Sequence, residues 1–339
     1  MQQYILAVDQ STQGTKGLLF DAEGRLVCRA DRPHRQIVND KGWVEHDPDE
    51  IIRNTIAVCA DVLQKADVSP DDVKAFGISN QRETSLMWNR ETGEPVANAI
   101  VWQCARAADI CARHEAAGEA DEIREKTGIP LSPYYPASKL QWLMENVPAA
   151  KKLAAEGKLA AGTIDTWLVY NLTADHVLKT DYSNAARTQL FNIHDLKWDE
   201  TLCGSFGIPV SALGEVVMSD SIFGMTDLGG LFKEPIPICG VLGDSNGALF
   251  GQNCRKPGEI KSTYGTGSSV MMNIGSDPVL SRSGLATSIA WGRNGTVEYV
   301  LEGNLNYTGA VITGTSKEVF EYYGMTGEGI AKKAKEALK

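Results

Sequence analysis

The sequence predicts an α/β fold that is built twice. Two stretches far apart in the chain, at residues 4–20 and 260–272, each read as an apolar strand, a tight turn of Gly, Ser and Thr, and a second apolar strand. A helical pattern that suits a crossover follows the first stretch, at residues 48–66. Such turns direct backbone N–H groups and hydroxyls into one concavity, which suits a phosphate. Two such hairpins indicate a nucleotide-using enzyme with two lobes.

Local patterns place the elements of the first half of the chain. The helix is expected to begin after Asp47, which suits an N-cap, with Pro48 in its first turn. Four residues share one face of this helix: Ile52, Ile56, Cys59 and Leu63. The other expected elements are strands at 4–9, 15–21, 25–32 and 73–79, and helices at 104–126 and 138–147.

The second half returns to strands after a mixed region at residues 160–235. A strand at 235–241 leads through Gly243 and Asp244 into a helix, and a domain boundary is expected near 244–256. The later elements are expected to be strands at 258–264, 268–274, 286–292 and 296–302, and a helix that opens within 304–312. The predicted domains are 1–246, 247–312 and 313–339.

Length and composition restrict the class of protein. A chain of 339 residues exceeds what one hydrophobic core usually serves, so two domains are expected. The net charge of −10 argues against a nucleic-acid partner. We find no signal-peptide pattern and no apolar run of the ~20 residues that span a membrane. The scattered cysteines predict reduced thiols in a cytoplasmic protein: Cys28, Cys59, Cys104, Cys111, Cys203, Cys239 and Cys254.

Phosphoryl transfer from ATP needs phosphate donors, an acid for Mg²⁺ and a base beside the attacking hydroxyl. Asp9 ends a strand at a Gly/Thr turn, where its carboxylate could reach Mg²⁺. Asp244 lies at a strand-to-helix turn, which suits a general base for a sugar or polyol hydroxyl. Residues that line the two turns supply the candidate phosphate donors: Thr12, Thr15, Lys16, Thr266 and Gly267.

Each candidate also has a structural interpretation. Asp9 alone could be a turn residue, and Asp244 could be a simple N-cap. Arg82 and Glu83 could form a solvated ion pair after a strand. Two aromatic residues are more often core residues than ligand platforms: Trp102 and Tyr134. The sequence contains neither a G-x-G-x-x-G after the first strand nor a G-x-x-x-x-G-K-[ST], which argues against Rossmann and P-loop folds.

Taken together, residues 3–312 resemble the FGGY family of carbohydrate kinases, and within it the glycerol kinases. The matching segments are Gly42-Trp43-Val44-Glu45-His46-Asp47-Pro48, Asn80-Gln81-Arg82-Glu83-Thr84, Ala99-Ile100-Val101-Trp102-Gln103-Cys104, the run from Tyr134 to Leu143, Asp165-Thr166-Trp167, Leu190-Phe191-Asn192-Ile193-His194, Gly243-Asp244, Ala248-Leu249-Phe250-Gly251-Gln252 and Thr263-Tyr264-Gly265-Thr266-Gly267.

This resemblance implies an actin-like, ribonuclease-H-type fold, with a complete first lobe, a truncated second lobe and a cleft between them. It also implies transfer of the γ-phosphate of ATP to a hydroxyl of a polyol or sugar. Asp244 would be the base and Asp9 would serve Mg²⁺. The implied polyol site contains Arg82, Glu83, Trp102, Tyr134, Asp244 and Ser245. The implied nucleotide contacts are Thr12, Gln13, Lys16, Thr266, Gly267 and Gly309.

Several positions depart from the glycerol kinase pattern. Ser245 replaces a usual Gln after the catalytic Asp, and Ser269 replaces a usual aromatic residue. Ser11 replaces a usual Gly, and Lys16 a usual Arg, so that residues 15–17 resemble those of xylulokinases. Because the two serines remove bulk, our hypothesis is that the pocket accepts a four- or five-carbon polyol or ketose, such as xylulose, as well as or instead of glycerol.

The end of the chain departs further. The similarity stops near Ile312, and about two dozen residues of the tail resemble the extreme C-terminus of transketolases. We therefore expect an incomplete second lobe, weak ATP binding, and exposed apolar strands at 258–302 that either risk aggregation or need a partner chain, such as a second copy in a homo-oligomer. A catalytically inactive fragment that binds polyol or a partner chain is the alternative to an active kinase. An Hsp70- or actin-type ATPase is disfavoured, because it would not need the predicted polyol pocket.

Overall fold

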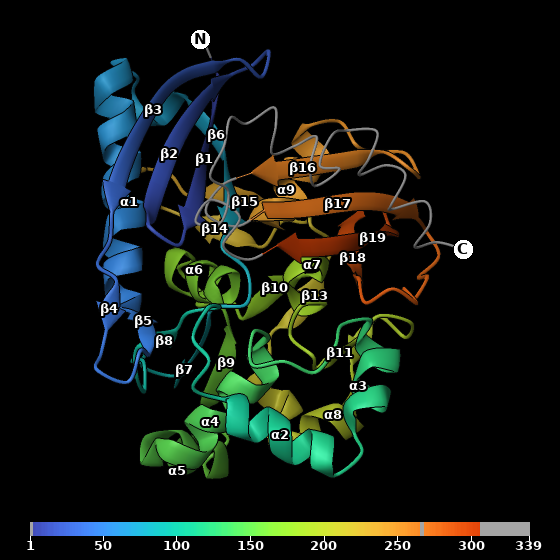
Figure 1. The fold of residues 1–339 in the computed structure, drawn as a ribbon. Coiled ribbons are helices and arrows are strands. Elements are labelled where there is room, and N and C mark those ends of the chain that lie inside the picture. Colours follow the sequence, from blue (N-terminus) through green and yellow to red (C-terminus); the bar gives the residue numbers. More distant parts are fainter. Residues whose placement is uncertain (1–2, 265–267, 306–339) are drawn as a thin grey trace.

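The computed structural model describes residues 3–264 and 268–305 (Figure 1). Among them, the largest sheet has six strands in the order β14-β15-β6-β1-β2-β3. β1 pairs antiparallel with β2 and parallel with β6, which in turn pairs parallel with β15. These strands are β1 (Tyr4–Ser11), β2 (Gly14–Asp21), β3 (Leu26–Pro33), β6 (Val73–Asn80), β14 (Gly224–Thr226) and β15 (Ile236–Gly243), which confirms the predicted strands near the N-terminus.

Helix α1 (Pro48–Ala66) packs along β2 and β3 (Figure 1). The predicted N-cap is confirmed, because the Asp47 side chain accepts a hydrogen bond from the N–H of Asp49. The predicted buried face is confirmed for Cys59 and Leu63, whereas Ile52 and Ile56 are only partly buried. A second stripe, one residue earlier, is buried as well and includes Ile51, Val58 and Val62. The buried residues of α1 are Pro48, Ile51, Thr55, Val58, Cys59, Val62 and Leu63.

A five-stranded sheet with the order β4-β5-β8-β7-β9 lies on the other side of α6 from the main sheet (Figure 1). The helix predicted at 104–126 is in fact two helices, because Gly118 has a φ of +79° and separates them. The strands are β4 (Ile37–Val38), β5 (Val44–His46), β7 (Ser85–Asn89), β8 (Ala99–Ile100) and β9 (Leu159–Thr163). The neighbouring helices are α2 (Ala108–Ala116), α3 (Ala120–Thr127), α4 (Pro136–Asn146), α5 (Pro148–Ala155) and α6 (Ile164–Leu172).

Short elements connect these layers. The two-stranded sheets are formed by β10 with β13 and by β11 with β12. The remaining elements of this region are η1 (Pro70–Asp72), β10 (Lys179–Asp181), α7 (Tyr182–Ala185), β11 (Phe191–Asn192), β12 (Lys197–Trp198), α8 (Glu200–Ser205), η2 (Val210–Ala212) and β13 (Glu215–Val217).

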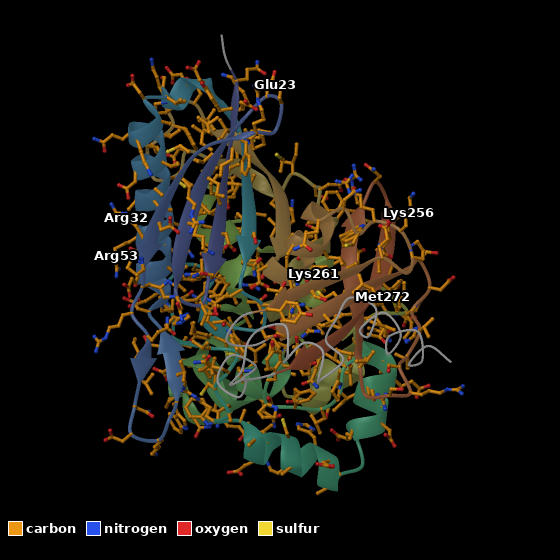
Figure 2. The ribbon with its side chains drawn as sticks, turned by 45° about the horizontal axis from the view of Figure 1, so that its top comes forward. Glu23, Arg32, Arg53, Lys256, Lys261 and Met272 are labelled. Carbon is orange, nitrogen blue, oxygen red and sulfur yellow. The ribbon has the colours of Figure 1, made fainter. Side chains whose placement is uncertain are left out.

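The last described part of the chain forms a four-stranded sheet with the order β16-β17-β19-β18. It consists of β16 (Ile260–Tyr264), β17 (Ser268–Gly275), β18 (Ala286–Arg293) and β19 (Thr296–Leu305), and it follows helix α9 (Asp244–Gly251). Figure 2 shows Lys261 and Met272 on the first two of these strands. All four strands were predicted. The helix predicted within 304–312 lies outside the described residues apart from its first two, which the structure places in β19.

The prediction that the strands at 258–302 expose apolar surface is wrong for most of this sheet. Seven of the eight residues of β18 are buried. Among the described residues of this segment, the exposed large hydrophobic side chains are those of Tyr264 and Val279. Leu249 of α9 forms a buried cluster with Met271, Trp291 and other apolar side chains of the sheet. The sheet is therefore covered in large part by the chain's own elements.

Two large hydrophobic cores hold the rest of the molecule together. One lies between the main sheet, α1 and α6, and includes Leu6, Phe76, Trp88 and Trp167. The other lies around β7, α4 and α8. No helix within the described ranges is long and apolar enough to cross a membrane. All seven cysteines carry free thiols, as predicted.

Candidate active site

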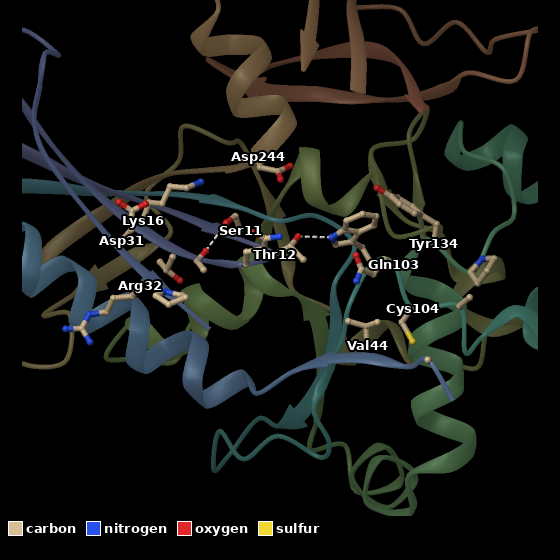
Figure 3. Close-up of a pocket in the computed structure, with 18 of the residues that line it drawn as sticks. Ser11, Thr12, Lys16, Asp31, Arg32, Val44, Gln103, Cys104, Tyr134 and Asp244 are labelled. Atoms are coloured by element: carbon tan, nitrogen blue, oxygen red, sulfur yellow. Dashed lines mark hydrogen bonds between the residues drawn. The ribbon is translucent and has the colours of Figure 1, made fainter. Parts of the chain in front are cut away.

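A pocket of about 1010 Å³ lies beside the ends of β1 and β15 (Figure 3). Ligands of open α/β folds bind outside the carboxyl ends of parallel strands, which is where this pocket lies. In Figure 3, Asp244 and Thr12 lie between Lys16 on one side of the pocket and Tyr134 on the other. The lining consists of residues 11–16, 31–33, 42, 44, 102–105, 132–134 and 244.

Asp244 directly follows β15 and is the first residue of α9. Its side chain is 42% exposed, so that its carboxylate is open to the pocket. One carboxylate oxygen accepts a hydrogen bond from the N–H of Ser245 at 2.6 Å, and Arg82 Nε lies 3.5 Å from the same oxygen. Loss of hydration at this site raises the pKa of Asp244, although Arg82 opposes the shift. A carboxylate with a raised pKa is a better base for a hydroxyl.

The turn between β1 and β2 forms one end of the pocket. Glycine is required at position 14, because a Cβ there would lie 2.5 Å from the carbonyl oxygen of Arg32. The carbonyl oxygen of Thr12 accepts hydrogen bonds from His34 Nε2 at 2.8 Å and Gln36 Nε2 at 2.5 Å. In a trans peptide this arrangement turns the N–H of Gln13 the opposite way. The side chains of His34 and Gln36 therefore hold the turn in one orientation.

Asp9 and Lys16 pair across the same hairpin. Lys16 Nζ lies 2.6 Å from one carboxylate oxygen of Asp9, and Ser79 Oγ donates to the other at 3.2 Å. Both members of the ion pair are partly exposed. Lys16 lines the pocket, whereas Asp9 lies behind it. No group of three or more His, Cys, Asp or Glu residues gathers as a metal cluster anywhere in residues 3–264 and 268–305.

Two aromatic rings form the opposite end of the pocket. The ring centroids of Trp102 and Tyr134 are 5.6 Å apart. The indole N–H of Trp102 donates to Thr12 Oγ1 at 2.8 Å, which links the aromatic end of the pocket to the turn (Figure 3). Lys139 is fully buried and donates to the carbonyl oxygens of Pro133 and Tyr134. Burial lowers the pKa of Lys139 to about 7, while its hydrogen bonds fix the segment that carries Tyr134.

Arg82 and Glu83 are not a solvated ion pair, because their side chains are only 5% and 2% exposed. Glu83 has a φ of +62° and lies at the turn after β6. Its carboxylate accepts from Arg187 Nε at 2.6 Å, and Arg82 pairs with Glu302 of β19 at 2.6 Å. The interpretation as a solvated pair is therefore wrong, and both residues belong to a buried network that borders Asp244.

The structure brings most of the predicted site residues to one place. Seven of them line the pocket: Thr12, Gln13, Thr15, Lys16, Trp102, Tyr134 and Asp244. Four lie next to it without lining it: Asp9, Arg82, Glu83 and Ser245. Three lie outside the described residues: Thr266, Gly267 and Gly309.

Sequence reasoning missed several residues at or beside the site, and four of them stand out. Gln103 and Cys104 line the pocket and directly follow Trp102, so their place in the same matched segment was a usable signal. Arg187 and Glu302 complete the buried network. Glu302 was visible as a charged residue within an apolar strand, whereas nothing in the local sequence singled out Arg187.

The strand order β3-β2-β1-β6-β15, with a pocket at the strand ends, defines an actin-like ATPase fold. The predicted fold class is thereby confirmed. The chain belongs to the FGGY family of carbohydrate kinases, because the sequence model of that family's N-terminal domain matches residues 4–251. The predicted family is likewise confirmed.

The chain is similar to full-length glycerol kinases over most of its own length. Glycerol kinase 1 of Thermotoga maritima is 48% identical over 309 residues, which are 91% of this chain and 63% of that protein. Glycerol kinase of Symbiobacterium thermophilum is 49% identical over 309 residues, which are 91% and 62% of the two chains. The chain thus spans about 63% of the length of these curated relatives.

The chain is also similar to solved structures of carbohydrate kinases. Plasmodium falciparum glycerol kinase, solved with ADP, superposes with a TM-score of 0.86 at 36% identity and covers 95% of this chain and 64% of that one. The xylulose kinase from Lactobacillus acidophilus has a TM-score of 0.80 at 23% identity, covering 95% and 66%, which shows the shared fold alone.

Proposed function

We propose that this chain carries the polyol site of an ATP-dependent carbohydrate kinase, with Asp244 as the general base. The proposal rests on the position of the Asp244 carboxylate. It opens into the pocket between the turn that ends at Lys16 and the two aromatic rings. A polyol against Trp102 and Tyr134 would present a hydroxyl to Asp244, while a γ-phosphate would approach from the turn.

The proposed substrate is glycerol or a four- to five-carbon polyol or ketose such as xylulose. A pocket of about 1010 Å³ is at the upper end of the usual range for small-molecule sites, so it has room for a sugar and part of a nucleotide. Ser245 and Ser269 stand where glycerol kinases usually carry larger side chains. Ser269 Oγ donates to Glu302 at 3.1 Å. Neither serine lines the pocket, so their small side chains could enlarge it only by leaving space behind the residues that do line it.

The residues around the turn fit a nucleotide phosphate and Mg²⁺. Mg²⁺ usually keeps several waters and binds through one or two carboxylates together with substrate phosphates. Asp9 can supply one carboxylate once Lys16 turns from it to a phosphate, and Thr12 and Gln13 offer a hydroxyl and backbone N–H groups. Bound Mg²⁺ would offset the charge of the phosphates. We propose that Thr266, Gly267 and Gly309 contribute further phosphate contacts.

The proton of the attacked hydroxyl passes to Asp244, and the hydroxyl oxygen attacks the γ-phosphorus in line with the departing ADP oxygen. Arg82 Nε lies 3.5 Å from the Asp244 carboxylate and would interact with its ionised form. Trp102 and Tyr134 would exclude water from the apolar faces of the polyol, which limits hydrolysis of ATP. The domain division at 246 and 312 is part of this proposal, and the seven free thiols support a reducing compartment such as the cytoplasm.

A coupled ADP-release assay of the purified chain tests the proposal, with glycerol, erythritol, xylulose and ribulose as acceptors. We expect ADP release that depends on one of these acceptors and falls about 10²–10⁴-fold in Asp244→Asn. Asp31→Asn is the matched control, because Asp31 also lines the pocket but pairs with Arg29 on the exposed side.

A chain that binds polyol in calorimetry but releases no ADP with any acceptor would contradict an active kinase and would establish the inactive binding fragment. If glycerol has the highest kcat/KM of the four acceptors, the proposal of a larger substrate is wrong.

A further inference from the structure

Four buried charged side chains form a continuous network behind Asp244. They come from the turn after β6, the segment that directly follows α7, and the middle of β19. Glu302 lies at the centre, since it pairs with Arg82 at 2.6 Å and with Arg187 Nη1 at 2.8 Å. Arg187 Nε also pairs with Glu83 at 2.6 Å. None of the four side chains is more than 5% exposed, so water screens the pairs little.

The geometry of Arg82 is set by its partners. Both terminal nitrogens are bound to Glu302, with Nη1 at 3.0 Å and Nη2 at 2.6 Å from its two carboxylate oxygens. Only Nε is directed to Asp244, and the distance of 3.5 Å is longer than a strong charged hydrogen bond. Asn246 Oδ1 accepts from Nη1 at 3.2 Å, while its Nδ2 donates to the carbonyls of Ile289 and Ala290. The guanidinium is thus held between α9 and the second-lobe sheet.

We propose that Glu302 is a positioning residue that occupies both terminal nitrogens of Arg82 and thereby prevents Arg82 from closing a two-point ion pair on Asp244. The inference rests on the proposed function of Asp244 as the base. In this proposal, Glu302 on β19 of the second lobe keeps the Asp244 carboxylate of the first lobe free to bind its substrate.

The physical reason is competition for one guanidinium. Arginine favours a two-point pairing with a carboxylate, and Glu302 provides it in a site without water. Without that partner, Arg82 would turn its terminal nitrogens to the next carboxylate within reach, which is Asp244. A direct pair of this kind typically lowers the pKa of an aspartate by about 1–3 units. Asp244 would then be a weaker base, with its oxygens already occupied.

Other charged groups also act on Asp244. Arg82 and Glu83 act on it from the turn after β6, Asp9 from β1 and Lys261 from β16. Lys16, Asp31 and Arg32 line the same pocket. Any substitution of Glu302 therefore has two separable effects, a change in the field at Asp244 and a change in the position of Arg82.

The test separates these effects by two variants. Glu302→Asp keeps the charge but is shorter by one methylene, so it cannot reach Arg82 and Arg187 as Glu302 does. Glu302→Gln removes the charge and keeps the shape. In both variants Arg187 retains Glu83, which leaves it paired. The readout is the pKa of Asp244, measured by NMR titration of protein labelled with ¹³C at the aspartate carboxyl carbon. Asp244→Asn identifies the signal, and circular dichroism checks the fold.

We expect the pKa of Asp244 to fall by about one unit or more in both variants. An unchanged pKa in Glu302→Asp would overturn the proposal, because it would mean that Glu302 acts on Asp244 only through its charge or only through the fold. If Glu302→Gln does not fold, Glu302→Asp decides alone. The titration needs no ATP, so it is independent of kinase activity. If Asp244→Asn leaves ADP release unchanged, it is the proposed function that fails.

Discussion

Asp165 is expected to make the stability of this protein depend on pH. It lies in the first turn of α6, and its side chain is fully buried. Its two oxygens accept hydrogen bonds from Thr163 Oγ1 at 2.5 Å and Thr180 Oγ1 at 2.6 Å. Burial, with the nearby Asp181 carboxylate as the second cause, raises the pKa of Asp165 from 3.8 to about 6. The folded protein therefore binds a proton at Asp165 more tightly than the unfolded chain does.

The magnitude follows from linkage between proton binding and folding. A shift of about 2 units corresponds to about 3 kcal/mol in the free energy of unfolding. Because the folded-state pKa is raised, the stabilisation is fully present below the unfolded pKa near 4 and is lost as the pH rises through 6. An unfolding entropy of about 2.1 cal/mol/K per residue converts this energy to about 4 °C in Tm for a chain of 339 residues.

Asp165→Asn tests this reasoning, because asparagine resembles the protonated acid and does not titrate. Thermal unfolding of the parent protein and the variant would be followed by circular dichroism between pH 4 and pH 8. We expect the variant to gain about 4 °C on the parent protein over that interval, since it is not destabilised by ionisation at position 165. Tm curves that stay parallel from pH 4 to pH 8 would refute the raised pKa of Asp165.

Two further predictions concern the pocket. Gly243→Ala would place a Cβ 2.7 Å from Arg82 Cδ, so we expect kcat to fall about tenfold or more. Gly240→Ala on the same strand is the control, because a Cβ there meets nothing within 4 Å, and equal kcat values for the two variants would contradict the close fit at Gly243. Trp102→Phe removes the hydrogen bond to Thr12 Oγ1 and should weaken polyol binding in calorimetry about 2–10-fold. Trp198→Phe loses a similar bond to the Gly214 carbonyl outside the pocket and should leave binding unchanged, so weaker binding in Trp198→Phe than in Trp102→Phe would refute the role of Trp102.

Local sequence patterns predicted elements better than faces or partners. The strands and α1 follow from periodicity and capping, because both signals depend on residues within one or two turns. The buried face of α1 could not be placed to the residue, since two of its stripes are apolar and only the sheet decides between them. Gly118 is a visible signal for the break at 104–126, but the surrounding Ala- and Glu-rich sequence concealed it.

The buried network shows where sequence reasoning stops. Arg82 is 220 positions from Glu302 in the chain, and Glu83 is 104 positions from Arg187. No periodicity joins residues at such separations, so a local interpretation treats Arg82 and Glu83 as a solvated pair. Asp244 was predicted because it follows Gly243 at a strand-to-helix turn, whereas Trp102 was implied only by the resemblance to the carbohydrate kinases. Their partners lie in ordinary strands and helices, where only the fold reveals them.

The central claim is that Asp244 receives the hydroxyl of a polyol in the pocket beside Trp102 and Tyr134. A crystal structure of the chain with its preferred acceptor tests it directly. We predict a substrate hydroxyl about 2.6–3.2 Å from an Asp244 carboxylate oxygen, with the carbon chain against the two aromatic rings. A polyol bound elsewhere on the molecule, with Asp244 out of reach of every hydroxyl, would contradict the account.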